Sequence, residues 1–131
     1  MGISTASYLL VGTGTADESA TLASVANNAT GGGSVVDLLG DDTSTGEVEL
    51  YLLLSSTVTV GYVQVRFNPQ RRNAADYAKP AYEVSVAPTN GAQKIPLGRR
   101  SCPRYASVDV FNNATGASCS VAVVAKVTKL S

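Results

Sequence analysis

Residues 47–55 read EVELYLLLS, and this stretch decides the fold of the chain. Its even-numbered positions are all Val or Leu, whereas its odd-numbered positions include two Glu and one Tyr. A period of two is the pattern of a β-strand that buries one face. The pattern recurs over residues 117–128, where the odd-numbered positions from 119 to 127 are Cys, Val, Val, Ala and Val. Both stretches therefore predict long strands with one face in a core.

Short apolar runs separated by Gly, Asn, Asp or Ser continue in both directions along the chain. We expect strands over residues 3–11, 19–26, 34–39, 47–55, 57–68, 81–87, 105–111 and 117–128. Residues 19–27 and 73–78 are the best helix candidates, but their periodicity is weak. A chain of 131 residues fits one domain. The sequence predicts a single all-β domain over residues 1–131, an antiparallel β-sandwich built as a jelly roll of about eight strands. Residues 1–7 are uncharged and are expected to form an N-terminal arm.

The composition excludes several classes of active site. There is no His, so His-based acid–base catalysis and His-containing metal sites are absent. Asp41, Asp42 and Glu47 lack the spacing of a calcium-binding EF-hand, and Gly12-Thr13-Gly14 lacks the third glycine of a nucleotide loop. We therefore expect no catalytic residues, no metal, no cofactor and no enzymatic activity. No apolar run approaches the ~20 residues of a membrane-spanning helix, and no basic flank marks a secretory signal, so synthesis in the cytoplasm is expected.

One five-residue string, Asn-Asn-Ala-Thr-Gly, occurs twice, at 27–31 and at 112–116. Asn and Gly tolerate positive φ, so each copy is interpreted as a turn rather than as a glycosylation acceptor at Asn28 or Asn113. The second copy predicts a hairpin between residues 105–111 and 117–128. In that hairpin Cys102 and Cys119 would be out of register by roughly 23 Å, so no disulfide is expected.

Charge is distributed unevenly although the net charge is zero. Residues 1–60 contain seven acidic and no basic side chains, whereas residues 61–131 contain ten basic and three acidic ones. Such asymmetry often marks an interaction surface. The alternative is that the two halves interleave in one sandwich and neutralise each other across adjacent strands. The sequence leaves both interpretations open.

A basic cluster is the sharpest candidate site. Arg is well suited to bidentate contacts with carboxylates at interfaces. Nucleic-acid binding would favour a net positive domain with exposed aromatic side chains, and here aromatics are only 6%. We therefore expect a protein partner for this cluster, which consists of Arg66, Arg71, Arg72, Lys94, Arg99, Arg100 and Arg104.

The small size, the eight predicted β-runs and the lack of catalytic groups resemble the jelly-roll cement or decoration proteins of tailed bacteriophage capsids. The resemblance covers the whole chain as a pattern, above all residues 47–68, 81–87 and 105–128. It implies a small, often trimeric β-domain on the capsid exterior of the virion. Its partner would be the major capsid protein, whose neighbouring units the domain would staple together.

Other classes remain as alternatives. A carbohydrate-binding or adhesin-like sandwich usually relies on exposed aromatic side chains, and this chain has six Tyr, two Phe and no Trp. A small viral coat protein is a second alternative. Coat proteins of small RNA phages have a similar length but end in helices, whereas this chain ends in the strand pattern CSVAVVAKVTKLS.

Overall fold

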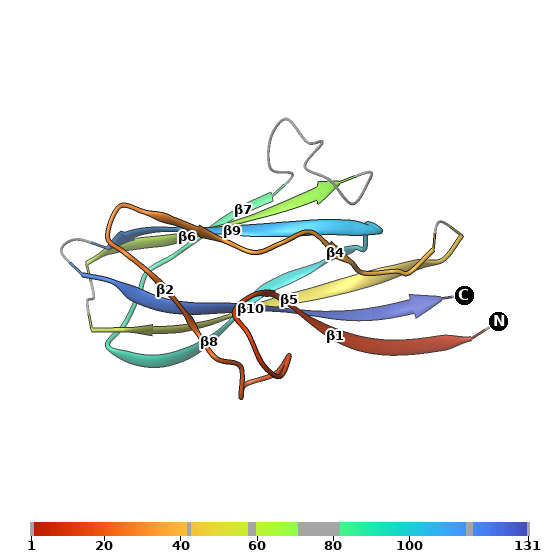
Figure 1. Ribbon diagram of the computed structural model, residues 1–131, viewed down its shortest axis with the longest axis horizontal. Helices are drawn as coiled ribbons and strands as arrows, with labels where there is room; N and C mark the ends of the chain where they lie inside the picture. Colours follow the sequence, from red (N-terminus) through yellow and green to blue (C-terminus); the bar gives the residue numbers. More distant parts are fainter. Residues whose placement is uncertain (1, 42, 58–59, 71–81, 115–116, 131) are drawn as a thin grey trace.

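The computed structural model describes residues 2–41, 43–57, 60–70, 82–114 and 117–130, and over these residues the chain is all-β without a helix. The strands lie in two antiparallel sheets that form two layers of a β-sandwich (Figure 1). Their bounds are β1 (Ile3–Val11), β2 (Ala23–Val25), β3 (Thr30–Gly32), β4 (Val36–Asp37), β5 (Thr45–Ser56), β6 (Gly61–Gln70), β7 (Tyr82–Val86), β8 (Gly91–Ser101), β9 (Tyr105–Ala114) and β10 (Cys119–Leu130). The predicted fold class, an antiparallel β-sandwich, is confirmed.

The first sheet has the order β1-β10-β5-β8, and the second has the order β3-β9-β6-β7. The short strand β2 pairs with β10 beyond the end of β1, and β4 pairs with β9 beyond the end of β3. Between β1 and β2 the chain makes an excursion that is closed by a bridge between Thr13 and Thr21. In each sheet one edge is therefore made of two successive short segments.

Strand pairing in the sandwich is nested. The first strand pairs with the last, β1 with β10, and the next segments, β3 and β4, pair with β9. Inside these pairs β5 lies against β8, and β6 lies against β7. The chain thus behaves as one long antiparallel ribbon that is rolled up, and the two sheets arise because successive nested pairs of strands fall alternately in one layer or the other.

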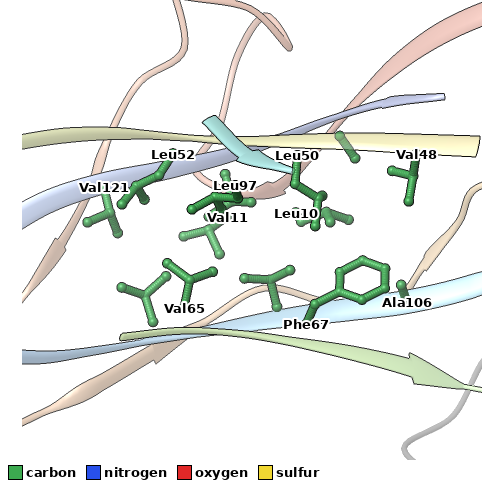
Figure 2. Packing of buried hydrophobic residues seen from close by; sticks show 14 of the residues in the cluster. Leu10, Val11, Val48, Leu50, Leu52, Val65, Phe67, Leu97, Ala106 and Val121 are labelled. Atoms are coloured by element: carbon green, nitrogen blue, oxygen red, sulfur yellow. The ribbon is translucent and has the colours of Figure 1, made fainter. Parts of the chain in front are cut away.

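The core lies between the two layers, as the period-two pattern requires. Val48, Leu50 and Leu52 project from β5 toward Val65 and Phe67 of β6 (Figure 2). Tight packing of branched aliphatic side chains removes most of this surface from water, which is the main favourable contribution to folding. Most of this interior comes from strands, and Leu38 and Leu39 of the loop after β4 are buried in it as well.

A second, smaller cluster lies on the outer face of the first sheet. Leu53, Ala122 and Val124 are buried there against Ala20 and Leu22 of the excursion between β1 and β2. This explains why Leu53 is apolar although its position in the alternation points away from the main core. The excursion therefore covers this part of the outer face.

The predicted hairpin of residues 105–111 and 117–128 is wrong. Both segments are strands, but β9 pairs with β6 and β10 pairs with β5, so they lie in different sheets. A period of two identifies a strand and its buried face, but it does not identify its neighbour. The register argument about Cys102 and Cys119 therefore fails, although both cysteines are free as expected.

Strand β8 was not predicted, because Pro96 and Gly98 resemble a turn. The register of β5 and β8 shifts between Leu50 and Tyr51, and Gly98 at the shift has a φ of 107°. A bulge and an edge position both permit proline and glycine within a strand. Residues 19–27 form no helix and contribute only β2, whereas the second helix candidate, 73–78, lies outside the described residues.

The predicted N-terminal arm is a strand over most of its length. Residues 3–7 pair with β10, from Ile3 opposite Leu130 to Ser7 opposite Lys126. Because the backbone of residues 3–7 is paired with β10 of the same domain, this stretch is not a free arm. The first and last strands consequently end side by side, as the labels N and C in Figure 1 show.

The two copies of the repeated string differ in structure. Asn28 of the first copy has a φ of 61° and lies in a turn, whereas Asn112 and Asn113 of the second copy belong to β9. The copies lie next to each other, because the Asn28 amide donates to the Asn112 carbonyl at 2.8 Å. The interpretation as a turn holds for the first copy, whereas residues 112–114 of the second copy belong to β9 and residues 115–116 lie outside the described residues.

Candidate functional site

The predicted basic cluster does not form one patch. Its members on the described residues are distributed over both sheets and over the edge between them, and Arg71 and Arg72 lie outside the described residues. The described members of the cluster form three groups, and each group is defined by the carboxylate or aromatic ring that it contacts.

Lys94 and Arg99 lie on the outer face of the first sheet. Arg99 donates from Nε to Glu49 Oε2 at 2.7 Å, and its Nη1 lies 3.6 Å from Glu47 Oε1. Lys94 donates to Glu18 and lies 4.4 Å above the centre of the Tyr51 ring. The hydrogen bond from Lys94 lowers the pKa of the Glu18 carboxyl. The hydrogen bond from Arg99 to Glu49 raises the pKa of the Arg99 guanidinium.

These pairs border a cleft of about 460 Å³ on the outer face. Its lining includes Ser7 of β1, Lys126 of β10, and Asp17 and Glu18 of the excursion, together with Tyr51. A smaller groove of about 200 Å³ continues toward Thr5 and Arg99. The lining carries both signs of charge, and Lys94 covers the Tyr51 ring. The cleft therefore offers no open aromatic platform for a sugar.

Arg66 and Arg104 are held by neighbours of the second sheet. Arg66 donates to Gln64 Oε1 at 3.0 and 3.2 Å and lies 3.7 Å from Glu83. Arg104 donates to Asp37 Oδ2 at 3.2 Å. Burial opposes ionisation of Asp37, but hydrogen bonds from Arg104 and from the Gly40 amide outweigh it and lower the pKa of this carboxyl. Both arginines therefore connect neighbouring segments of the second sheet.

Arg100 lies at the edge of the sandwich where β7 of one sheet faces β8 of the other. Its guanidinium carbon lies 3.2 Å from the centre of the Tyr82 ring, and the Tyr82 hydroxyl donates to the Leu97 carbonyl. These two contacts join the edges of the two sheets. Sequence reasoning did not identify Tyr82, because nothing local distinguishes it from the other five tyrosines.

Next to Arg100 is a pocket of about 330 Å³ lined by Phe67, Pro69, Tyr82 and Cys102, among other residues. Burial raises the pKa of the Cys102 thiol to about 11. A thiol with this pKa is protonated at neutral pH, so Cys102 is not an activated nucleophile. Burial also raises the pKa of Cys119, which packs in the core.

Charges from the two halves of the sequence interleave. Acidic side chains of residues 1–60 pair with basic side chains of residues 61–131 in Glu18–Lys94, Asp37–Arg104, Asp41–Lys129 and Glu49–Arg99. The two halves therefore neutralise each other in these pairs, between neighbouring strands in Glu49–Arg99 and through loop residues in the other three. Segregated acidic and basic faces are not found among these pairs.

The described part of the chain contains neither a metal-binding cluster nor a membrane-spanning helix. Within it, no group of three His, Cys, Asp or Glu side chains comes together to hold a metal ion. Asp41 instead accepts hydrogen bonds from the amides of Thr43 and Ser44 and from the Ser44 hydroxyl, which lower the pKa of its carboxyl. The same residues contain no helix long and apolar enough to cross a membrane.

Comparison with known proteins gives no relative. No protein-family model, curated protein or solved structure matches the chain significantly. The resemblance to capsid decoration proteins thus stands on the sequence pattern, and a functional conclusion must come from the sandwich itself.

Proposed function

We propose that the sandwich is a jelly roll and that the chain is a viral capsid decoration protein. In this proposal it binds the exterior of the virion and stabilises the lattice of the major capsid protein through protein–protein contacts. Several copies acting together would convert weak single contacts into strong attachment.

The nested strand pairing carries this proposal. A jelly roll is an antiparallel ribbon rolled into two sheets, so that its first strand lies beside its last and the inner strands pair in the same nested way. The pairs β1 with β10, β3 and β4 with β9, β5 with β8, and β6 with β7 follow that scheme. Jelly rolls recur in viral capsid proteins and in lectins.

The surface favours binding over catalysis. The charged side chains of the candidate cluster that the structure describes are engaged in structural contacts, whereas several large apolar side chains are exposed. Ile3 is 73% exposed, Val60 is 61% exposed and Leu130 is 44% exposed. Exposed apolar side chains at the ends of strands are suited to burial against another protein.

A comparison of particles with and without the chain tests the proposal. Particles that lack it should release their genome at a lower temperature than complete particles, and adding the purified chain back should restore the difference. Light scattering and dye fluorescence during heating measure this release. Equal stability of the two kinds of particle would contradict the proposal.

The same nested fold supports the two alternatives, and two further measurements separate them. Electron microscopy of the purified chain alone would reveal closed shells if it were a coat protein. Binding to a glycan array without an effect on particle stability would identify a carbohydrate-binding module. Either result would replace the decoration function.

A further inference from the structure

The two edges of the first sheet differ sharply. At one edge β8 contains Pro96, the Gly98 bulge, Lys94, Arg99 and Arg100. Proline, bulges and charged side chains are the devices by which natural sheets prevent an edge from pairing with another chain. At the other edge β1, with the sequence ISTASYLLV, contains no charge, no Pro and no Gly. One edge is protected and the other is left open.

The first half of the open edge is also well exposed to solvent. Residues 3–7 of β1 are exposed at every position, so side chains on both faces of this stretch are accessible. At its end the apolar side chains of Ile3 and Leu130 lie opposite each other and are 73% and 44% exposed. In an antiparallel ladder every second residue directs its N–H and C=O away from the paired neighbour. Among the described strands only β10 pairs with this part of β1.

We propose that β1 pairs antiparallel with β1 of a second copy of this chain, around a twofold axis at Ala6. This register places Thr5 opposite Ser7 of the other copy and Ser4 opposite Tyr8. It also places the exposed Ile3 beside Leu9, which is on the same face of the strand because no bulge separates them. The first sheet then continues without interruption from one molecule into the next.

A second copy fits this edge because the strand is compatible with itself. Around a twofold axis each strand pairs with an identical strand that runs in the opposite direction. A charged side chain near the axis would therefore lie close to the same charge on the other copy. The uncharged run of small, hydroxyl-bearing and apolar side chains creates no such conflict, and every new hydrogen bond forms twice. Such a pairing closes with two copies, which favours a dimer over the trimer expected from the family resemblance.

Charge variants at Ala6 test this pairing on the purified full chain. Sedimentation and light scattering should show a dimer for the wild-type protein. Ala6→Lys and Ala6→Glu should each weaken self-association by roughly a hundredfold or more, because like charges meet at the axis. An equimolar mixture of the two variants should restore dimers, because opposite charges then meet. Recovery in the mixture also shows that both variants are folded.

Ala92→Lys is the matched control, since Ala92 is an exposed alanine on the opposite, protected edge of the same sheet. This variant should dimerise as the wild type does. The proposal is overturned if the wild-type chain is a monomer from micromolar to millimolar concentration. Dimers of unchanged strength in Ala6→Lys, or a mixture that stays monomeric, would overturn it too. None of these results depends on attachment to a capsid, which is measured separately.

Discussion

Asn112 and Gly33 show how single residues join the two layers. Asn112 is fully buried on β9, and its amide group donates to the carbonyls of Val25 and Ala117 at 2.9 and 3.0 Å. Without the bond to Val25 a buried carbonyl would lose its partner, which costs about 1–3 kcal/mol. Gly33 acts by the absence of a side chain, because its amide donates to the Val108 carbonyl while its α-carbon lies against β1.

Gly33→Ala should destabilise the protein by about 2 kcal/mol or more, because the added Cβ would overlap the backbone carbonyl of Leu10 and neither backbone can move freely. Urea denaturation followed by circular dichroism measures the change in the free energy of unfolding. Gly32→Ala is the control, since its Cβ would meet only the mobile carboxylate of Asp109 at 2.8 Å. Equal effects of the two substitutions would show that the close approach at Gly33 is unimportant.

The sequence could not distinguish these roles. Asn112 opens the same five-residue string that begins at Asn27, yet one copy continues a strand and the other makes a turn. The difference comes from neighbours in space, since Asn112 lies between β6 and the turn before β3, where it bonds with the backbone of Asn28 and Ala29. For the same reason the sequence could not show that Arg100 contacts the ring of Tyr82, which belongs to the other sheet.

Strand β5 is the element whose two faces perform different tasks. Leu50, Leu52 and Leu54 point into the main core, whereas Leu53 packs on the outer face under the excursion between β1 and β2. The two clusters differ in size and in what covers them. A second strand layer covers one, and a single loop segment covers the other.

Leu52→Ala should lower the free energy of unfolding of the whole domain by about 2–5 kcal/mol, because it leaves a cavity between two packed sheets. Leu53→Ala should have a smaller global effect and should instead loosen the excursion locally. Hydrogen exchange would report this as faster exchange at Thr13 and Thr21, whose amides bond to each other's carbonyls. Uniform loss of protection in both variants would mean that the two clusters are one cooperative unit.

The positions of strands could be predicted where apolar and polar side chains alternate, but the pairing partner of each strand could not. The predicted strand at 3–11 has the same bounds as β1, and β5 and β10 lie where their alternation predicts them. Strands β3 and β8 escaped prediction, because Thr30–Gly32 and the Pro96–Gly98 region have the composition of turns. The open edge of β1 could have been found from its uncharged sequence, once its place at the edge was known.

The whole molecule is a roll whose ends meet. Ile3 lies opposite Leu130, and paired residues of antiparallel strands have α-carbons about 4.5–5.5 Å apart. Internal ion pairs between the two halves of the sequence run through the same roll and stabilise it weakly, because most of their side chains are exposed. The architecture therefore depends on burial and on strand pairing rather than on charge.

A circular permutant should retain the fold. A short Gly/Ser linker would join the two ends, and new ends would be opened at the exposed residues Thr89 and Asn90 between β7 and β8. The permutant should give a β-sheet circular dichroism spectrum and one cooperative unfolding transition. Opening the chain between Leu52 and Leu53 instead should abolish folding, because this cut divides a central strand. An unfolded Thr89–Asn90 permutant would contradict the nested pairing.

The pairing of β1 with β10 also sets the order in which a ribosome can complete the domain. Of the strands of this domain, Ile3–Val11 leaves the ribosome first, and its partner Cys119–Leu130 leaves last. At ordinary rates of translation, on the order of a hundred intervening residues take about ten seconds to synthesise. During that interval an uncharged strand has no partner from its own chain, and nascent chains on one messenger lie close to one another. Newly made copies therefore meet with the same edge exposed before either has closed its roll.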